Sequence, residues 1–442
     1  MTSSKNSKFI KISNVTASGN KLEVKLEFSK EVAKYFFKNH FEVYYDKNIE
    51  NVDESILTIP AVCATVQIAW ATGADLYVDK LDETFLSILP KIRKVFEGYY
   101  PKFSSSGDIH VKEPIVNKFN NKQSALFFSS GLDSLDSYKR NKDQNPILIT
   151  ILRIDKSNHL IKYHNDIRNL VNNFAKQQGN DVHFIRSQLW NFVSNDIIND
   201  RLLCRDFKIS NWWEDVSHGF IRLGLLAPLT VKRIGRVFTA SNYKKNYRLP
   251  NGSHFLADND FSWADVEVIY DGDLTRQEKL QFLKHSPHYL KNLLVCYEPI
   301  HSTYPKNCGF CPKCWRTITS LILEGIDPIE CNFDIKNNVL DEIKHILNDC
   351  KFLFKYRHLF PDIQNYIPDT YNGNEVSRKY HAKEFFEWFR NYQFPDDDYR
   401  EGIRFFNKLK FIYYCVKYNG INFTIKLIQR SSQEKISHLR VI

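Results

Sequence analysis

The pattern of apolar and polar positions changes character near residue 123 of the chain. Upstream of that point, residues 21–28 and 41–45 alternate between apolar and polar side chains, as half-buried strands do. Residues 82–96 instead follow a helical pattern that begins at two acids and contains a proline. The first hundred residues therefore predict an α+β unit. Residues 100–122, which are rich in serine and asparagine, predict a linker.

From residue 123 onward, short apolar runs alternate with amphipathic helical patterns. The runs that predict strands are 125–128, 147–154, 182–185 and 236–240, and the patterns that predict helices are 160–178 and 220–231. Alternation of this kind is typical of a parallel sheet that is covered by helices on both faces. Ligands bind such sheets at the loops that follow the carboxyl ends of the strands.

The last part of the chain has helical spacing rich in aromatic residues, at 339–354, 377–392 and 399–418. These patterns predict an α/β protein with three regions. We expect an N-terminal α+β domain (1–115), a parallel-sheet domain (116–330) and a helical C-terminal region (331–442).

Composition narrows the class of protein and the kinds of ligand to be expected. The chain has 442 residues, a formal net charge of +10 and nine cysteines, which suits a globular protein that prefers anionic ligands. An odd cysteine count with four of the nine in one short region favours metal binding over a disulfide framework. Residues 1–8 are polar, and no apolar run is long enough to span a membrane. We expect a cytoplasmic protein without a membrane partner.

The first strand of the alternating region runs into the small-residue loop Ser129-Ser130-Gly131 and then into a helical pattern. Small residues let an anion approach several backbone N–H groups, and the amino end of the helix adds its positive dipole. Asp133 can hold a magnesium ion against such an anion. The alternative is a Ser/Gly turn that only caps the helix.

The same residues resemble the S-G-G-x-D-S signature of the PP-loop ATP pyrophosphatases. Carried over by position, the ATP-binding residues are Ser129, Ser130, Gly131, Leu132, Asp133 and Ser134, with Asp133 and Ser134 as the catalytic pair. The resemblance implies an adenine nucleotide alpha hydrolase-like core that binds ATP and Mg²⁺ and cleaves ATP between its α- and β-phosphates. Ser130 stands where the family usually has glycine, so either its backbone adopts positive φ or its hydroxyl contacts a phosphate oxygen.

The second chemical signal is a group of four cysteines, Cys296, Cys308, Cys311 and Cys314, in which two C-x-x-C steps share Cys311. Four thiolates at this spacing predict a closed, structural Zn²⁺ site. An iron–sulfur cluster is the rival, but its fourth thiolate would follow closely, and the next cysteine downstream is Cys331.

A PP-loop followed by this cysteine group is similar to the 7-cyano-7-deazaguanine synthases over about residues 122–330. That resemblance implies ATP-dependent activation of a carbonyl or carboxylate oxygen, release of pyrophosphate, and displacement of AMP by nitrogen, as in a C–N ligase. The acceptor would be a small molecule or nucleobase, and ammonia would come from solution or from an operon-encoded protein partner. The helical C-terminal region suggests a homo-oligomer.

Two alternative functions stay open. The chain can be a nucleotide-binding or assembly module with a degenerate loop, or a sugar amidotransferase of a surface polysaccharide pathway. Lys244 and Arg248 lie in a basic loop that can clamp a planar anion, although a plain surface loop fits as well. His218 can serve as a general base or as a helix cap, and Cys204 would be the reactive thiol of a sulfur-transfer enzyme.

Overall fold

A computed structural model of the chain describes residues 8–100, 103, 107–154, 158–201, 212–241, 244, 251–296, 305–349, 360–394, 413 and 416–417. The chain separates into two compact units. The first unit comprises Met1–Ser129 and Ser137–Asp273, and the second comprises Ser130–Asp136 and Leu274–Ile442. This division differs from the three regions that the sequence suggested. The difference arises because the N-terminal strands and the alternating strands share one sheet.

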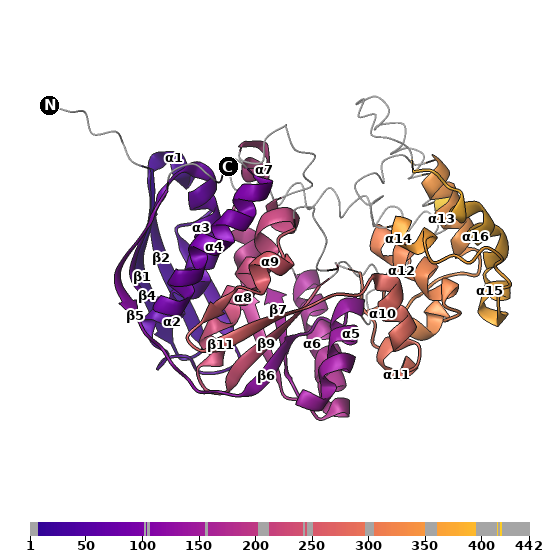
Figure 1. The fold of residues 1–442 in the computed structure, drawn as a ribbon, viewed down its shortest axis with the longest axis horizontal. Helices are drawn as coiled ribbons and strands as arrows, with labels where there is room; N and C mark the ends of the chain where they lie inside the picture. Colours follow the sequence, from indigo (N-terminus) through magenta and orange to yellow (C-terminus); the bar gives the residue numbers. More distant parts are fainter. Residues whose placement is uncertain are drawn as a thin grey trace. The chain divides into compact units, whose positions relative to one another are not determined.

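The first unit is built on an eleven-stranded sheet with the order β10-β11-β9-β6-β7-β8-β3-β2-β1-β4-β5 (Figure 1). Its strands are β1 (Phe9–Ser18), β2 (Lys21–Phe28), β3 (His40–Tyr45), β4 (Asp75–Asp82), β5 (Ile109–Ile115), β6 (Gln123–Phe127), β7 (Ile147–Arg153), β8 (Val182–Ser187), β9 (Ile234–Ala240), β10 (Ser262–Trp263) and β11 (Val266–Asp271). The strands β11, β9, β6, β7 and β8 are all parallel to their neighbours within this group. The expected α/β class with a largely parallel sheet is therefore confirmed.

The N-terminal strands join this parallel group through one antiparallel pair. β3 pairs with β8 in a register that places Val43 opposite Ser187 and Tyr45 opposite Ile185. Sequence patterns cannot reveal this pairing, because the paired segments lie more than a hundred residues apart. The predicted strands at 21–28 and 41–45 are confirmed as β2 and β3.

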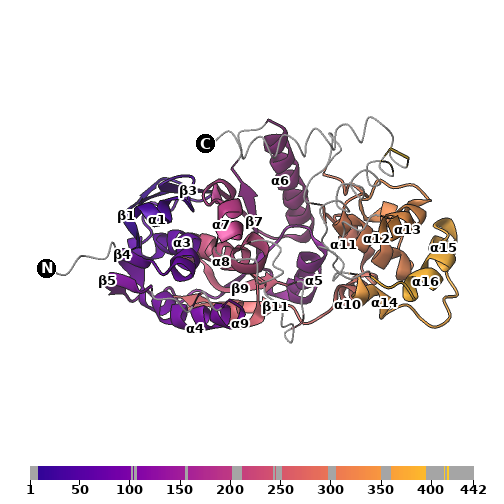
Figure 2. The same cartoon turned by 90° about the horizontal axis from the view of Figure 1, so that it is seen from above.

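The parallel strands lie between two layers of helices (Figures 1 and 2). Ala125 of β6 and Ile149 of β7 belong to the core that also contains α3 (Ile59–Thr72), α4 (Glu83–Tyr99) and α8 (His218–Thr230). On the opposite face, the Phe128 ring stacks on Phe174 of α6 (Asn158–Gln178) with a centroid distance of 4.6 Å. Both faces of these strands are thus largely covered, which fits their mostly apolar sequences.

Two segments of the first unit differ from the prediction. Helix α3 is buried on every side, so its sequence shows no amphipathic period, and it ends at Gly73 with a φ of 67°. The expected linker contains β5, an edge strand whose side chains are mostly exposed. The remaining helices of the chain's first part are α1 (Lys30–Ala33), α2 (Glu54–Leu57), α5 (Leu132–Asn141), α7 (Asn195–Arg201) and α9 (Phe255–Asp258).

The second unit is helical in its described part. Its helices are α10 (Arg276–Leu283), α11 (Pro287–Leu290), α12 (Pro312–Leu323), α13 (Val339–Asp349), α14 (Pro361–Gln364), α15 (Glu375–Lys379) and α16 (Ala382–Arg390). Asp327 accepts hydrogen bonds from Lys379 Nζ at 2.6 Å and from the Tyr380 hydroxyl at 2.7 Å, which connects α15 to the turn after α12. The expected helix at 399–418 lies outside the described residues, apart from 413 and 416–417.

Among the described helices of both units, none combines the length and the apolar character needed to cross a lipid bilayer.

Candidate functional site

The loop between β6 and α5 has the backbone that a glycine would favour. Ser130 has a φ of 58°, in the left-handed region, and its side chain is fully buried. Its hydroxyl makes no hydrogen bond to any described residue. Of the two possibilities that the sequence left for Ser130, the structure has the positive φ. A small serine side chain is thus held at a left-handed position that glycine adopts without strain.

The start of α5 is fixed by hydrogen bonds to the Gly131 carbonyl oxygen. The Leu135 N–H and the Ser134 hydroxyl both donate to it, at 2.9 Å each. Ser134, which the PP-loop resemblance makes catalytic, is thus buried, and its hydroxyl bonds back to the carbonyl oxygen three residues earlier. Leu132 is also buried, so it can contact a ligand only through its backbone.

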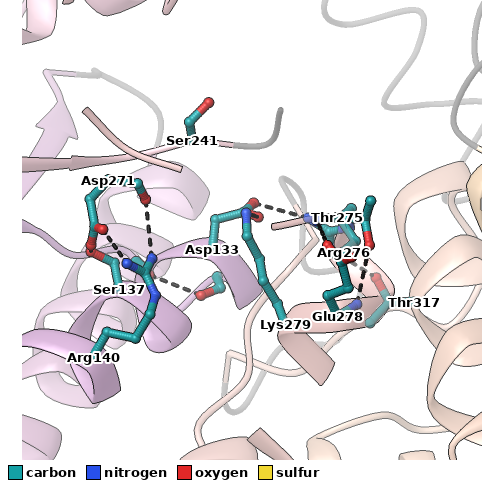
Figure 3. Close-up of polar contacts among 12 residues, drawn as sticks. Asp133, Ser137, Arg140, Ser241, Asp271, Thr275, Arg276, Glu278, Lys279 and Thr317 are labelled. Atoms are coloured by element: carbon teal, nitrogen blue, oxygen red, sulfur yellow. Dashed lines mark hydrogen bonds and ion pairs between the residues drawn. The ribbon is translucent and has the colours of Figure 1, made fainter. Parts of the chain in front are cut away.

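Asp133 lies in the first turn of α5 and contacts two cations from α10. Lys279 Nζ is 2.7 Å from one carboxylate oxygen, and the Arg276 guanidinium is 2.9 Å from the other (Figure 3). The Lys279 side chain is only 1 % exposed. Burial alone would raise the pKa of Asp133, but the charges of Lys279, Arg276 and Arg316 outweigh burial and lower the pKa to about 2.

The start of α10 fixes the helix face on which these two cationic side chains lie. Thr275 accepts from the Glu278 N–H, and the Glu278 carboxylate accepts from the Thr275 N–H at 2.7 Å, so the two residues form a capping box. Arg276 and Lys279 are three residues apart and therefore lie on the same face of the helix. Sequence analysis named neither of these two cations. Their partner is 143 and 146 residues away, and no spacing rule reaches that far.

A separate polar cluster holds the second half of α5 to the sheet of the first unit. Asp271, at the carboxyl end of β11, accepts from the Ser137 hydroxyl and pairs with Arg140 (Figure 3). Asn141 Nδ2 donates to the same carboxylate at 2.7 Å. These contacts fix the helix that begins at the loop, and sequence analysis named none of the residues involved.

The four predicted cysteine ligands come together in the second unit. Their sulfur atoms lie within 4.8 Å of one another. The closest pairs are Cys311 to Cys314 at 3.5 Å, Cys308 to Cys314 at 3.6 Å and Cys296 to Cys311 at 4.0 Å. A tetrahedral ion with Zn–S bonds of about 2.3 Å would place its sulfurs about 3.8 Å apart. The group can therefore hold one metal ion such as zinc.

Backbone geometry explains why this short segment curls around one centre. Gly309 has a φ of 70°, and a Cβ there would lie 2.7 Å from Ile335 Cγ2. That turn lets the N–H groups of Phe310 and Cys311 donate to Cys308 Sγ, at 3.4 and 3.3 Å. Hydrogen bonds from the neighbouring thiols lower the pKa of Cys311, whereas the same neighbours and burial raise the pKa of Cys308 and of Cys314.

The cysteine group and the loop are connected through the segment before Cys296. The Leu294 N–H donates to the Ser130 carbonyl oxygen at 2.8 Å. Two residues later, the Cys296 N–H donates to Asn307 Oδ1 at 3.1 Å, and the Val295 N–H donates to the same oxygen at 2.7 Å. A metal held by Cys296 would thus stabilise the segment on which the loop backbone rests.

The other sequence candidates contribute less. His218 begins α8, and its Nδ1 lies 3.0 Å from the Trp213 carbonyl oxygen, where it closes the π-helical turn Trp213–Ser217. Cys204 and Arg248 lie outside the described residues, and Lys244 is described without its loop neighbours.

Comparison of the chain with protein-family models, with curated proteins and with solved structures finds no match.

Proposed function

We propose that the loop 129–134 binds the triphosphate of ATP and that the chain uses ATP to activate a carbonyl or carboxylate oxygen for nitrogen transfer. One observation carries the proposal. The small-residue loop turns through the left-handed Ser130 into the first turn of α5, where Lys279 and Arg276 meet Asp133. A helix amino end with two cationic side chains is suited to a pyrophosphate group.

The chemistry that fits this arrangement is transfer of AMP. An oxygen of the acceptor attacks the α-phosphorus of ATP, the bond to the β-phosphate oxygen breaks, and pyrophosphate leaves. A nitrogen nucleophile then displaces AMP from the activated carbon and loses a proton to solvent. Lys279 and Arg276 would stabilise the charge that develops on the departing pyrophosphate.

Asp133 is the residue that would bind magnesium, which would link the protein to the phosphates. Both of its carboxylate oxygens contact cations, so the phosphates would have to draw Lys279 or Arg276 away from Asp133. The four cysteines would hold a structural zinc ion, because a closed set of four thiolates leaves no position for a substrate.

A degenerate nucleotide-binding module is the second candidate, and a specific observation favours it. The ion pairs at Asp133 satisfy the carboxylate without any ligand, and Ser130 adds a side chain where the loop needs space. In that case the site would bind nucleotide without cleaving it.

Calorimetric titration with Mg²⁺ and ATP, followed by an assay of pyrophosphate release, tests the proposal. We expect binding in the parent chain and weaker binding in Lys279→Met by about tenfold or more, because a charge-assisted contact to phosphate is lost. Lys284→Met is the matched control, since Lys284 ends the same helix and pairs with Glu324 instead. Binding without pyrophosphate release across a panel of carboxylate, nucleobase and sugar acceptors would favour the module. Absence of ATP binding would overturn both readings.

A further inference from the structure

A cavity in the first unit lies at the carboxyl end of β7, and its lining includes none of the residues assigned above. It has a volume of about 430 Å³, within the range of ordinary ligand pockets. Its lining comes from β7, α6 and β8 and consists of Leu152, Arg153, Ile154, Ile161, His164, Asn165, Arg168 and Arg186. Three of these residues are arginines and none is acidic. The cavity is therefore strongly cationic.

The lining side chains converge because of their spacing on regular elements. Ile161, Asn165 and Arg168 are four and three residues apart along α6 and share one helix face. Arg186 pairs with Leu152 across β8 and β7, so both side chains stand on the same face of the sheet. The helix face and the sheet face enclose the cavity between them.

Arg168 and Arg186 are held by aromatic rings instead of by acids. The Arg168 guanidinium lies 4.4 Å from the centroid of the Phe184 ring, and that of Arg186 lies 5.3 Å from the Tyr44 ring. Within the part of the chain that the structure describes, neither guanidinium makes an ion pair or a hydrogen bond. A ring contact fixes the plane of a guanidinium and leaves its N–H edge available to an anion.

The cavity also has an apolar wall. Leu152 is buried, while Ile161 keeps 43 % of its surface exposed. A ligand that covered Ile161 would remove apolar surface from water at the same time as it paired with the arginines. The combination suits a molecule with a charged end and an apolar or planar body.

We propose that this cavity binds a small organic anion, a carboxylate or a phosphate ester that carries an apolar or aromatic group. The forked guanidinium groups can donate two parallel hydrogen bonds to either kind of anion. The proposal does not rest on the function proposed above, because it requires neither ATP nor the loop 129–134. Its failure would leave that function untouched.

The first test uses the aromatic sulfonate 8-anilinonaphthalene-1-sulfonate as a fluorescent probe on the full chain. We expect one saturable site, weakened by salt, and a loss of affinity of about tenfold in Arg186→Gln and more in Arg168→Gln/Arg186→Gln. Arg236→Gln is the matched control, because Arg236 lies on the same sheet and pairs with Glu267. Thermal unfolding of each variant checks that the fold persists. Arg186 is exposed, so its replacement leaves the core intact.

Displacement of the probe then separates the two kinds of anion. The competitors are 1-naphthoate, 1-naphthyl phosphate, inorganic phosphate and the uncharged 1-naphthalenemethanol. Displacement by either naphthyl anion at concentrations where naphthalenemethanol has no effect supports the proposal, and the stronger of the two identifies the charged group. Equal probe affinity in the parent and the Arg186→Gln variant would overturn it. So would displacement by naphthalenemethanol as strong as that by the anions.

Discussion

Lys279 Nζ lies 2.7 Å from the Asp133 carboxylate although only 1 % of the Lys279 side chain is exposed. A buried ammonium group is stable only beside a counter-charge, and Asp133 supplies it. The contact joins the first turn of α5 to α10, and both belong to the second unit. The residue that sequence analysis assigned to magnesium thus has a structural partner, and two experiments follow from that pair.

Asp133→Asn should destabilise the second unit at neutral pH. The substitution leaves Lys279 buried without its counter-charge, a loss of about 3 to 5 kcal/mol in the free energy of unfolding. Lys279→Met combined with Asp133→Asn should recover part of that loss, because the buried ammonium group is removed together with its partner, while Arg276 still loses its carboxylate. Urea denaturation of the parent chain, Asp133→Asn, Lys279→Met and the double variant measures the coupling free energy between Asp133 and Lys279. Asp369→Asn, which removes an exposed partner of Arg390, serves as the control. Additive effects of the two substitutions would contradict the pair.

The same pair predicts a pH dependence. The pKa of Asp133 is about 2 in the folded chain, below the usual 3.8. A lowered pKa means that the unfolded state binds the proton more readily, so the stabilisation is fully present above about pH 5 and is lost as the pH falls toward 2. We expect the difference in unfolding free energy between the parent chain and Asp133→Asn to shrink by roughly 2 kcal/mol between pH 6 and pH 2. A difference that stays constant over this range would refute the assignment.

Asp258 should make the free energy of unfolding depend on pH in the opposite direction. Its carboxyl group is buried in the first unit, and burial raises its pKa to about 7, although the Ser253 hydroxyl and the charge of Arg222 oppose the rise. Between about pH 4 and pH 7 the folded state therefore holds a proton that the unfolded state has lost, and stability falls as the pH rises.

The measurement for Asp258 compares the parent chain with Asp258→Asn from pH 4 to pH 8. We expect the variant to gain roughly 4 kcal/mol relative to the parent over that range, because the amide cannot ionise. The exposed Asp260→Asn is the matched control two residues away. Parallel stability curves for the parent and Asp258→Asn would show that the carboxyl group does not titrate in this range.

Zinc should copurify with the chain at about one ion per molecule, bound by the four cysteines. Elemental analysis of the purified protein measures it. Cys311→Ser should lose the metal and fold poorly, whereas Cys331→Ala should keep it, because Cys331 is buried but lies outside the cysteine group. Iron and sulfide in place of zinc would show that the site is a cluster. Because Leu294 donates to the Ser130 carbonyl oxygen, loss of zinc should also weaken binding at the loop.

The parts of this structure that could be predicted from the sequence are those with a local signal. Strands β6 to β9 were found because each has a short apolar run. The cysteine group was found because the spacing of its cysteines along the sequence is already typical of a metal site. The PP-loop identity of residues 129–134 stays a prediction, since no comparison tests it.

The parts that could not be predicted depend on distant pairing or on missing periodicity. The join between β3 and β8 brings Tyr44 beside Arg186, and no local pattern encodes it. Helix α3 is apolar on all sides, so its sequence lacks the 3.6-residue period of an amphipathic helix. Strand β5 is a largely exposed edge strand, so its sequence only partly shows the alternation of apolar and polar residues that marks a half-buried strand. The sequence around Lys279 and Arg276 is that of an ordinary exposed helix. Only the fold shows that both side chains contact Asp133.

Ser130 offers the sharpest test of the loop, because its backbone and its hydroxyl can be separated. Its φ of 58° costs roughly 1 kcal/mol for a non-glycine residue, and its buried hydroxyl has no partner among the described residues. Ser130→Ala keeps the strained backbone and removes only the hydroxyl. Without ligand it should raise the unfolding free energy by about 1 kcal/mol, because an unsatisfied buried polar group is removed.

Ser130→Gly relieves the backbone instead. Glycine gains about 1 kcal/mol from the left-handed conformation but loses a similar amount to the greater freedom of the unfolded chain, so its stability should be nearly that of the parent. If the hydroxyl donates to a phosphate oxygen, both variants should bind ATP and Mg²⁺ more weakly, by about tenfold. If the side chain merely occupies space, Ser130→Gly should bind at least as tightly as the parent chain. In that case, pyrophosphate release in Ser130→Gly with none in the parent would identify this one serine as the reason for a degenerate loop.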